Sequence, residues 1–198
     1  MKKILTLISF LALFGCVDTI NQRSEINHAQ TAYSAQTRGD WDTARRHWAK
    51  AVVNANLANE PDEKLAILNY EYGRSLGVTC FFDESEKYLN TAYELDKKTN
   101  GPSYNDLIEL ARLNLDQKKW DKAINYFDKA MPELERVNAE TKAPHAYADI
   151  LADYAKALEG LNRSESAEYS QRAENIRKDN PQGHSITDRT PYGTQCTN

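Results

Sequence analysis

The chain has 198 residues, with 25 basic and 29 acidic side chains and a formal net charge of −4. This length suits one domain with a modest core. The acidic balance argues against nucleic acid or an anionic lipid surface as the main ligand, because both attract an excess of positive charge.

The N-terminal segment has the three parts of a secretory signal. Lys2 and Lys3 precede an apolar run over residues 4–14, which ends at Gly15 and Cys16. This run is too short to cross a bilayer as a helix, which takes about 20 residues. We therefore expect export, with any membrane attachment supplied by another feature.

The residues that precede the cysteine, Leu13 to Gly15, resemble the lipobox of bacterial lipoproteins, although Phe14 replaces the small residue usual at its position. The resemblance implies a signal peptide over residues 1–15, acylation of Cys16 and a lipidated tether over residues 16–23. Two or more acyl chains anchor a protein stably. The alternative is an ordinary cleaved signal in which the cysteine occurs by chance.

Val17 bears on which membrane holds the protein. In many enterobacterial lipoproteins an aspartate directly after the lipidated cysteine retains the protein in the inner membrane, and this chain has Val17 there and Asp18 one place later. The resemblance therefore favours the periplasmic face of the outer membrane, within the cell envelope.

Apolar and small residues return every three or four positions from about residue 24 to residue 180, which predicts an all-α domain. Within it four segments align on a small residue. In the first three segments an aromatic ring lies three positions earlier, and in all four an alanine lies seven positions later. The four small residues are Ala44, Ser85, Ala123 and Ser166.

This pattern resembles the tetratricopeptide repeat (TPR), most closely over residues 39–51 and 120–130. The resemblance implies a right-handed superhelical stack of about four helical hairpins, an α-α solenoid. The anchors lie 38 to 43 residues apart, more than the usual 34, and resemble the longer repeats of kinesin light chains. The register of the fourth repeat stays open between Tyr154 and Ala155. Residues 181–198 form a polar tail rich in Gly and Pro.

The resemblance also implies a binding groove on the first helix of each hairpin, where this family holds peptides. The family's groove positions correspond to Tyr33, Gln36, Tyr70, Arg74, Ile108 and Arg112. Arg74 and Arg112 occupy equivalent places in adjacent repeats and should lie side by side, as a cradle for a carboxylate or an acidic peptide. In the alternative interpretation Glu71, Glu109 or Asp116 neutralises each arginine.

Cys80 and Cys196 remain if Cys16 is lipidated, an even pair in a compartment that permits disulfides. A bridge would tie the tail to the second repeat. The alternative is two free thiols, with Cys80 as a small buried apolar residue.

No catalytic motif, metal-ligand spacing or cofactor-binding loop is recognisable, and the four histidines are scattered at positions 28, 47, 145 and 184. We therefore expect a protein that is not an enzyme, a membrane-anchored scaffold that binds an envelope protein or peptide without metal or cofactor. One alternative is an accessory regulator of a wall-acting enzyme, or a weak hydrolase built from scattered carboxylates. Another is glycan binding, which requires the rings of Trp41, Trp48 and Trp120 to lie outside the core.

Overall fold

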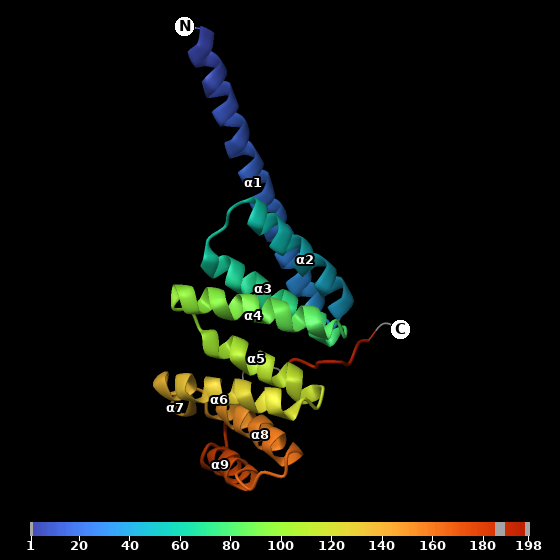
Figure 1. The fold of residues 1–198 in the computed structure, drawn as a ribbon, viewed down its shortest axis with the longest axis vertical. Helices are drawn as coiled ribbons and strands as arrows, with labels where there is room; N and C mark the ends of the chain where they lie inside the picture. Colours follow the sequence, from blue (N-terminus) through green and yellow to red (C-terminus); the bar gives the residue numbers. More distant parts are fainter. Residues whose placement is uncertain (1, 185–188, 197–198) are drawn as a thin grey trace.

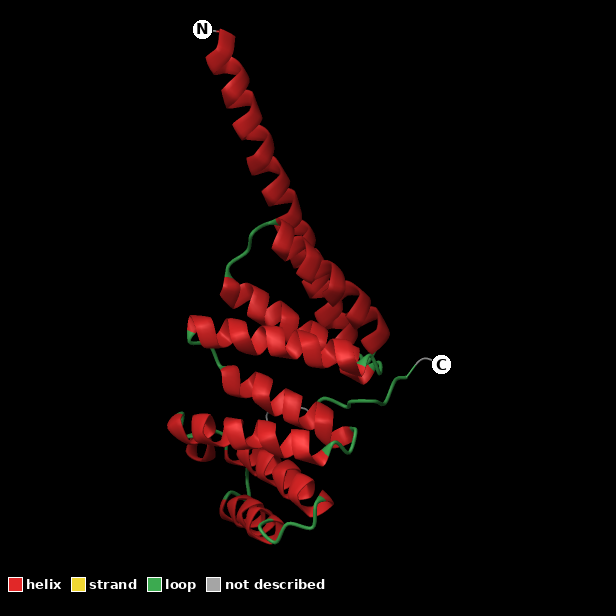
Figure 2. Ribbon diagram, viewed as in Figure 1, coloured by secondary structure: helices red, strands yellow, loops and turns green. Residues whose placement is uncertain are grey.

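Helices make up all of the regular secondary structure in residues 2–184 and 189–196, the part of the chain that the computed structural model describes (Figure 2). Side chains are described from residue 18 onward, with the same gap. The described helices are α1 (Lys2–Thr37), α2 (Trp41–Leu57), α3 (Asp62–Val78), α4 (Phe82–Thr99), α5 (Ser103–Asp116), α6 (Trp120–Arg136), α7 (Ala139–Lys142), α8 (Pro144–Gly160) and α9 (Ser166–Asp179).

Consecutive helices pair into hairpins, and the hairpins stack in chain order. α1 packs on α2, α3 on α4, α5 on α6 and α8 on α9, while α2, α4 and α6 contact the first helix of the following hairpin. Figure 1 shows the hairpins following one another along the long axis of the molecule. The predicted helical solenoid is therefore confirmed, with the short helix α7 inserted between the third and fourth hairpins.

The reversals between helices share one backbone feature, a residue in the left-handed region with φ between 51° and 75°. Glycine adopts this conformation freely and asparagine tolerates it, whereas it is uncommon for other residues. A single such residue ends one helix and turns the chain toward the next. The turn residues are Gly39, Asn59, Cys80, Asn100, Lys118, Asn138 and Asn162.

Small residues allow the two helices of a hairpin to approach closely, as the repeat pattern predicts. Ala44, Ser85 and Ala123 are completely buried. The Ser85 hydroxyl donates a 2.7 Å hydrogen bond to the carbonyl of Gly73 on the facing helix, and a Cβ at Gly73 would lie 2.8 Å from the Leu89 side chain. Ser166 is only half-buried and begins α9, so the fourth hairpin departs most from the pattern.

The tryptophan rings contribute to packing. Trp41 and Trp48 are buried. Trp120 is half-buried, and a Cβ at Gly160 would meet its ring at 2.4 Å. These positions count against a glycan-binding platform made of tryptophan.

The first helix continues without a break from Lys2 through the segment expected to be the signal and tether and into the first hairpin. The Cys16 side chain lies outside the described residues, so its acylation stays a prediction. No helix in the described part of the chain has a stretch long and apolar enough to span a membrane.

Candidate functional site

The first helices of the last three hairpins, α3, α5 and α8, lie next to one another and form a continuous surface, which we call the inner face. Successive turns of these helices contribute rows of side chains across it. Tyr70, Arg74 and Gly77 follow one another along α3, and Ile108, Arg112 and Asp116 do so along α5. The inner face therefore has two halves, made by the N-terminal and the C-terminal parts of the three helices.

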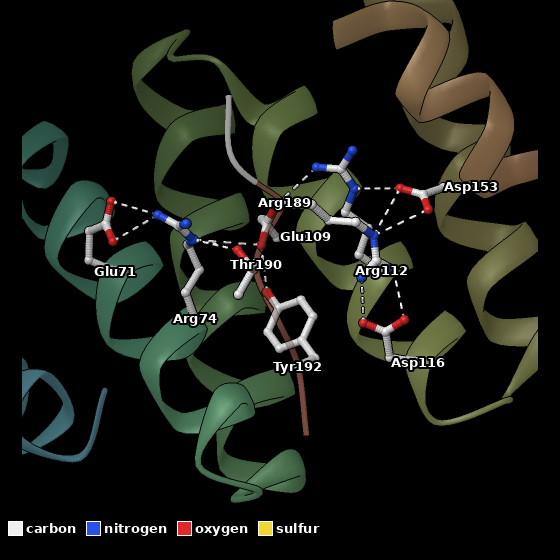
Figure 3. Close-up of polar contacts among 9 residues, drawn as sticks. All are labelled: Glu71, Arg74, Glu109, Arg112, Asp116, Asp153, Arg189, Thr190 and Tyr192. Carbon is white, nitrogen blue, oxygen red and sulfur yellow. Dashed lines mark hydrogen bonds and ion pairs between the residues drawn. The ribbon is translucent and has the colours of Figure 1, made fainter. Parts of the chain in front are cut away.

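A row of alternating charges separates these halves (Figure 3). Arg74 lies 3.0 Å from Glu71 and 3.6 Å from Glu109, whereas Arg112 lies 3.5 Å from Glu109 and 2.8 Å from Asp153. Glu109 thus stands between the two arginines. The two guanidinium groups occupy equivalent places in adjacent hairpins, but acidic neighbours already neutralise them, as in the second interpretation of the sequence.

Burial makes this row sensitive to the loss of any member. Glu109 is 5% exposed and Arg112 is 6% exposed. Burial alone would raise the pKa of Glu109, but the nearby charges of Arg74 and Arg112 lower it below its usual value, so the carboxylate stays ionised. An ion pair at this depth leaves an uncompensated charge when one partner is removed.

The C-terminal segment returns to this row and crosses the inner face. We call residues 189–196 the C-terminal strap. Arg189 binds Asp116 at 2.7 Å and Asp153 at 3.2 Å. The Thr190 hydroxyl accepts a 2.8 Å hydrogen bond from Arg74, and the Tyr192 hydroxyl donates one of 2.7 Å to Glu109. Thr190 and Tyr192 are buried, although the sequence predicts a polar tail here.

The far end of the strap is fixed at the C-terminus of α3. The backbone amides of Gly193 and Gln195 donate to the carbonyls of Gly77 and Val78, at 3.1 and 3.0 Å. These carbonyls belong to the last turn of α3, where a helix leaves acceptors without partners. Cys196 forms a disulfide with Cys80 in the turn that follows α3.

Gly77 makes room for the strap. A Cβ at this position would lie 2.5 Å from the Tyr192 ring and 2.8 Å from Leu113. Any side chain here would displace the ring, so the glycine inside α3 serves close packing rather than helix formation, which it disfavours.

The N-terminal half of the inner face stays open and contains a cavity of about 470 Å³. One side of the cavity is formed by the connection that contains α7. Its lining mixes tyrosines and aliphatic side chains with the edge of the charged row, and comprises Tyr70, Arg74, Tyr104, Asn105, Ile108, Glu109, Arg112, Leu134, Val137, Ala139, Lys142, Ala143, Ala146, Tyr147 and Ile150.

Four of the six groove residues predicted from the sequence line this cavity, namely Tyr70, Arg74, Ile108 and Arg112. The other two belong to α1 and do not line it. Tyr33 is 62% exposed. Gln36 accepts a hydrogen bond from Trp48 and donates one to Glu71, so it holds the first two hairpins together.

The sequence reasoning missed the contributions of the α7 connection and of α8. Tyr104 and Asn105 lie one turn before Ile108 on α5 and could have been included by helical spacing. Ala146 and Ile150 belong to the fourth repeat, whose register the sequence pattern does not fix.

A second, smaller cavity of about 210 Å³ adjoins the start of α5, and Asp96 and Asp106 line it. Asp106 is 1% exposed, and one of its carboxylate oxygens has no hydrogen-bond partner. Burial and the nearby charge of Asp96 raise the pKa of Asp106 to about 8. A carboxyl group that holds its proton at neutral pH is the kind of group a hydrolase could use as a general acid.

Two of the histidines that are far apart in the sequence meet in the structure. The Nδ1 atoms of His28 and His47 lie 3.1 Å apart across α1 and α2. Burial lowers the pKa of His28, and the charges of His47 and Lys50 lower it further. No group of three or more metal-ligating side chains occurs in the described residues.

No family model matches the sequence, and no curated protein sequence does either. The fold is shared with solved structures. BtubC (BKLC) from P. vanneervenii is 16% identical and superposes with a TM-score of 0.72, over 82% of this chain and 66% of that one, so this chain spans just under two thirds of BtubC. Nearly identical TPR-like repeats of the kinesin light chain type from Podosopora anserina are also 16% identical, with a TM-score of 0.62 and 87% of each chain covered.

Proposed function

We propose that this TPR-like fold serves as a non-enzymatic scaffold, anchored in the cell envelope through a lipid on Cys16, which binds a segment of another envelope protein in the open half of the inner face. TPR-like folds generally mediate contacts between proteins. The observation that carries the proposal is the cavity of about 470 Å³ beside the charged row, lined by Tyr104, Ile108 and Ala146 among others.

The lining indicates what the partner would insert. Arg74 and Arg112 already have acidic partners at 2.8 to 3.6 Å, so a carboxylate would have to compete with Glu109 and Asp153 for them. Aliphatic and aromatic side chains make up most of the remaining wall. An apolar or aromatic side chain of the partner therefore fits this cavity better than the acidic group first expected from the sequence.

The anchor would hold the scaffold close to the membrane. Cys16 lies within α1, and Glu25, nine positions later, is the first buried side chain described on that helix. At a helical rise of about 1.5 Å per residue, the folded domain would begin about 14 Å from the acyl chains. Partners at the same membrane surface would then lie close to the inner face.

A photo-crosslinking residue tests the binding site. Placed at Tyr104 in the cavity, it should form an adduct with an envelope protein in living cells, and at Glu168 on the exposed surface of α9 it should not. Filling the cavity with Ala146→Trp should abolish the adduct, and Ala167→Trp on α9 is the matched control. An adduct that persists unchanged in Ala146→Trp would contradict binding in the cavity.

A separate experiment tests the anchor. Mass spectrometry of the N-terminal peptide of the mature protein should find Cys16 carrying acyl chains, and Cys16→Ala should move the protein from the membrane fraction to the soluble fraction. Recovery of an unacylated, soluble mature protein from the unmutated chain would exclude the lipid anchor.

The second candidate function is regulation of a wall-acting enzyme, or weak hydrolysis by the chain itself, and the Asp96–Asp106 pair is the observation that favours it. Incubation of the full chain with purified cell-wall polymer should release fragments if the pair is catalytic, and Asp106→Asn should abolish that release. Activity that is absent, or unchanged in Asp106→Asn, excludes hydrolysis by this pair. The near-complete burial of Asp106 limits its access to a polymer.

A further inference from the structure

The C-terminal strap lies on the inner face as a bound peptide would. It runs from α8 to the end of α3 with a turn at Tyr192 and Gly193, and both main-chain and side-chain groups contact the helices beneath it. The main-chain hydrogen bonds to Gly77 and Val78 require no particular side chain, although the φ of 72° at Gly193 favours glycine there. The contacts of Arg189 and Tyr192 require those particular side chains.

The arginines beneath the strap keep acidic partners of their own, whereas its Tyr192 ring packs in a buried cluster with Val78 and Leu113. Arg74 keeps Glu71 and Glu109 as partners without it, and Arg112 keeps Glu109 and Asp153. The carboxylates of this surface nevertheless outnumber its guanidinium groups, and Asp116 has Arg189 as its only ion-pair partner among the described residues. The uncovered surface would therefore attract a cation.

The shape of the surface adds a second requirement. Gly77 and Leu113 border a depression that the Tyr192 ring fills, and Glu109 at its end accepts the phenolic hydroxyl. An occupant thus needs an arginine and, three residues later, a tyrosine.

A covalent bond fixes the strap, and that bond is within reach of solvent. Cys196 is exposed and Cys80 is half-buried. A dithiol reductant of the oxidoreductase class could attack the Cys196 sulfur, forming a mixed disulfide and releasing Cys80 as a thiolate. The second thiol of the reductant would then release Cys196. Two electrons and two protons pass to the two cysteines, and the reductant becomes a disulfide.

We propose that the strap is a built-in occupant of a peptide-binding site, that reduction of Cys80–Cys196 releases it, and that an Arg-x-x-Tyr segment of another protein then takes its place. This site is the covered half of the inner face, and it does not rest on the open cavity assigned above. Reduction converts a closed surface into one that is acidic and has an aromatic-sized depression.

Trypsin cleavage after Arg189 tests the release in the unmutated full chain. In the oxidised protein the guanidinium is held by Asp116 and Asp153, so cleavage should be slow. After treatment with a dithiol it should be at least about tenfold faster, because local opening governs proteolysis. Cys196→Ser should give the fast rate without reductant, whereas cleavage after Arg163 in the α8–α9 turn should not change. Equal rates at Arg189 would show that the disulfide is no switch.

Peptide binding tests the site itself. The full chain with Arg189→Ala, Tyr192→Ala and Cys196→Ser keeps every residue of the inner-face helices, and circular dichroism checks its fold. A fluorescent peptide with the sequence Arg-Thr-Pro-Tyr-Gly-Thr should bind it, and a peptide with alanine in place of Arg and Tyr should not. Adding Asp116→Asn should weaken binding at least about tenfold, since the two charge-assisted hydrogen bonds that Asp116 accepts from the arginine lose their ionised partner.

The unmutated chain provides a second measurement if that variant is not helical. Excess peptide should slow re-formation of the Cys80–Cys196 disulfide when the reduced chain is oxidised, because the peptide keeps the strap from rebinding. Failure of the peptide in both assays overturns the proposal, and so does a dimer that forms on reduction, which would assign the site to the strap of a second copy. Ala146→Trp in the open cavity should leave both assays unchanged, so the two proposals fail independently.

Discussion

The two halves of the inner face are built from the same three helices, yet one is covered by the chain itself and the other is open. The covered half contains Asp116 and Asp153, which bind Arg189. The open half is mostly aliphatic and aromatic and is walled by the α7 connection. An acidic surface can be closed by an eight-residue segment with one well-placed arginine, whereas an apolar cavity needs a side chain of matching volume. The halves thus differ in the kind of partner they can hold.

The largest predicted effect on stability comes from substitution of Glu109, which borders both halves of the inner face. Glu109→Ala leaves the buried Arg74 and Arg112 without their common partner and removes the acceptor of the Tyr192 hydroxyl. We expect a loss of about 3 to 5 kcal/mol in the free energy of unfolding, measured by urea denaturation. Glu165→Ala, which breaks an exposed pair with Arg163, is the control and should leave the midpoint unchanged. A similar midpoint for both variants would show that the charged row does not stabilise the fold.

Loss of the Cys80–Cys196 disulfide should have the next largest effect on the free energy of unfolding. The bond constrains the covered half of the folded protein and the unfolded chain. The bond closes a loop with a sequence separation of 116 residues. Cys196→Ser should therefore lower the free energy of unfolding by about 2 to 4 kcal/mol, and Cys80→Ser should match it. The same denaturation assay on the reduced unmutated chain should reproduce the two variants. A reduced chain as stable as the oxidised one would mean that the bridge constrains nothing.

Gly77→Ala should affect the covered half selectively. The added methyl group would meet the Tyr192 ring at 2.5 Å, and overpacking of this kind costs about 1 to 3 kcal/mol, partly offset by about 1 kcal/mol from better helix propensity. In a chain that also carries Tyr192→Ala the same substitution should cost less, because the ring is gone. The double-mutant cycle measures this coupling. Additive effects would indicate that Tyr192 does not pack on Gly77 in solution.

The sequence predicts well what depends on local repetition. Ala44, Ser85 and Ala123 recur because every hairpin needs a small residue at its closest approach, and all three are buried as expected. Tyr70, Arg74, Ile108 and Arg112 follow from the same register and line the open cavity. Tyr33 does not, because α1 contributes no residue to the cavity that α3, α5 and α8 form with the α7 connection.

The strap could not be predicted in this way. Its contacts join residues separated by 73 positions for Arg189 and Asp116, 83 for Tyr192 and Glu109, and 116 for Thr190 and Arg74. Polar residues with Gly and Pro are typical of exposed tails, and burial of Thr190 depends on partners that no local pattern reveals. An aromatic residue and a cysteine within a polar tail are the available signals, and the cysteine alone leads to a prediction, the disulfide with Cys80.

The smallest predicted effect concerns Asp106, a buried acid three residues before Glu109 on α5. Glu109 in the charged row has a lowered pKa because two arginines face it, whereas Asp106 beyond the open half faces Asp96 and Glu109, and burial raises its pKa to about 8. The folded state therefore binds a proton at Asp106 that the unfolded chain releases above about pH 4. Stability from this group is complete below that value and is lost as the pH rises toward 8.

The Asp106→Asn variant has no titratable group at this position, so it should not lose stability in this way as the pH rises. We expect the free energy of unfolding of the variant, relative to that of the unmutated chain, to rise by at least about 1 kcal/mol from pH 4.5 to pH 8. This lower bound corresponds to a pKa shift of less than one unit. Urea denaturation at several pH values measures the difference, with Asp83→Asn, at an exposed position in the first turn of α4, as the matched control. Parallel stability profiles for Asp106→Asn and the unmutated chain would mean that Asp106 is ionised in the folded protein. Asp106 would then be ionised like Glu109, and the two side chains would differ only because no arginine in the described part of the chain lies beside Asp106.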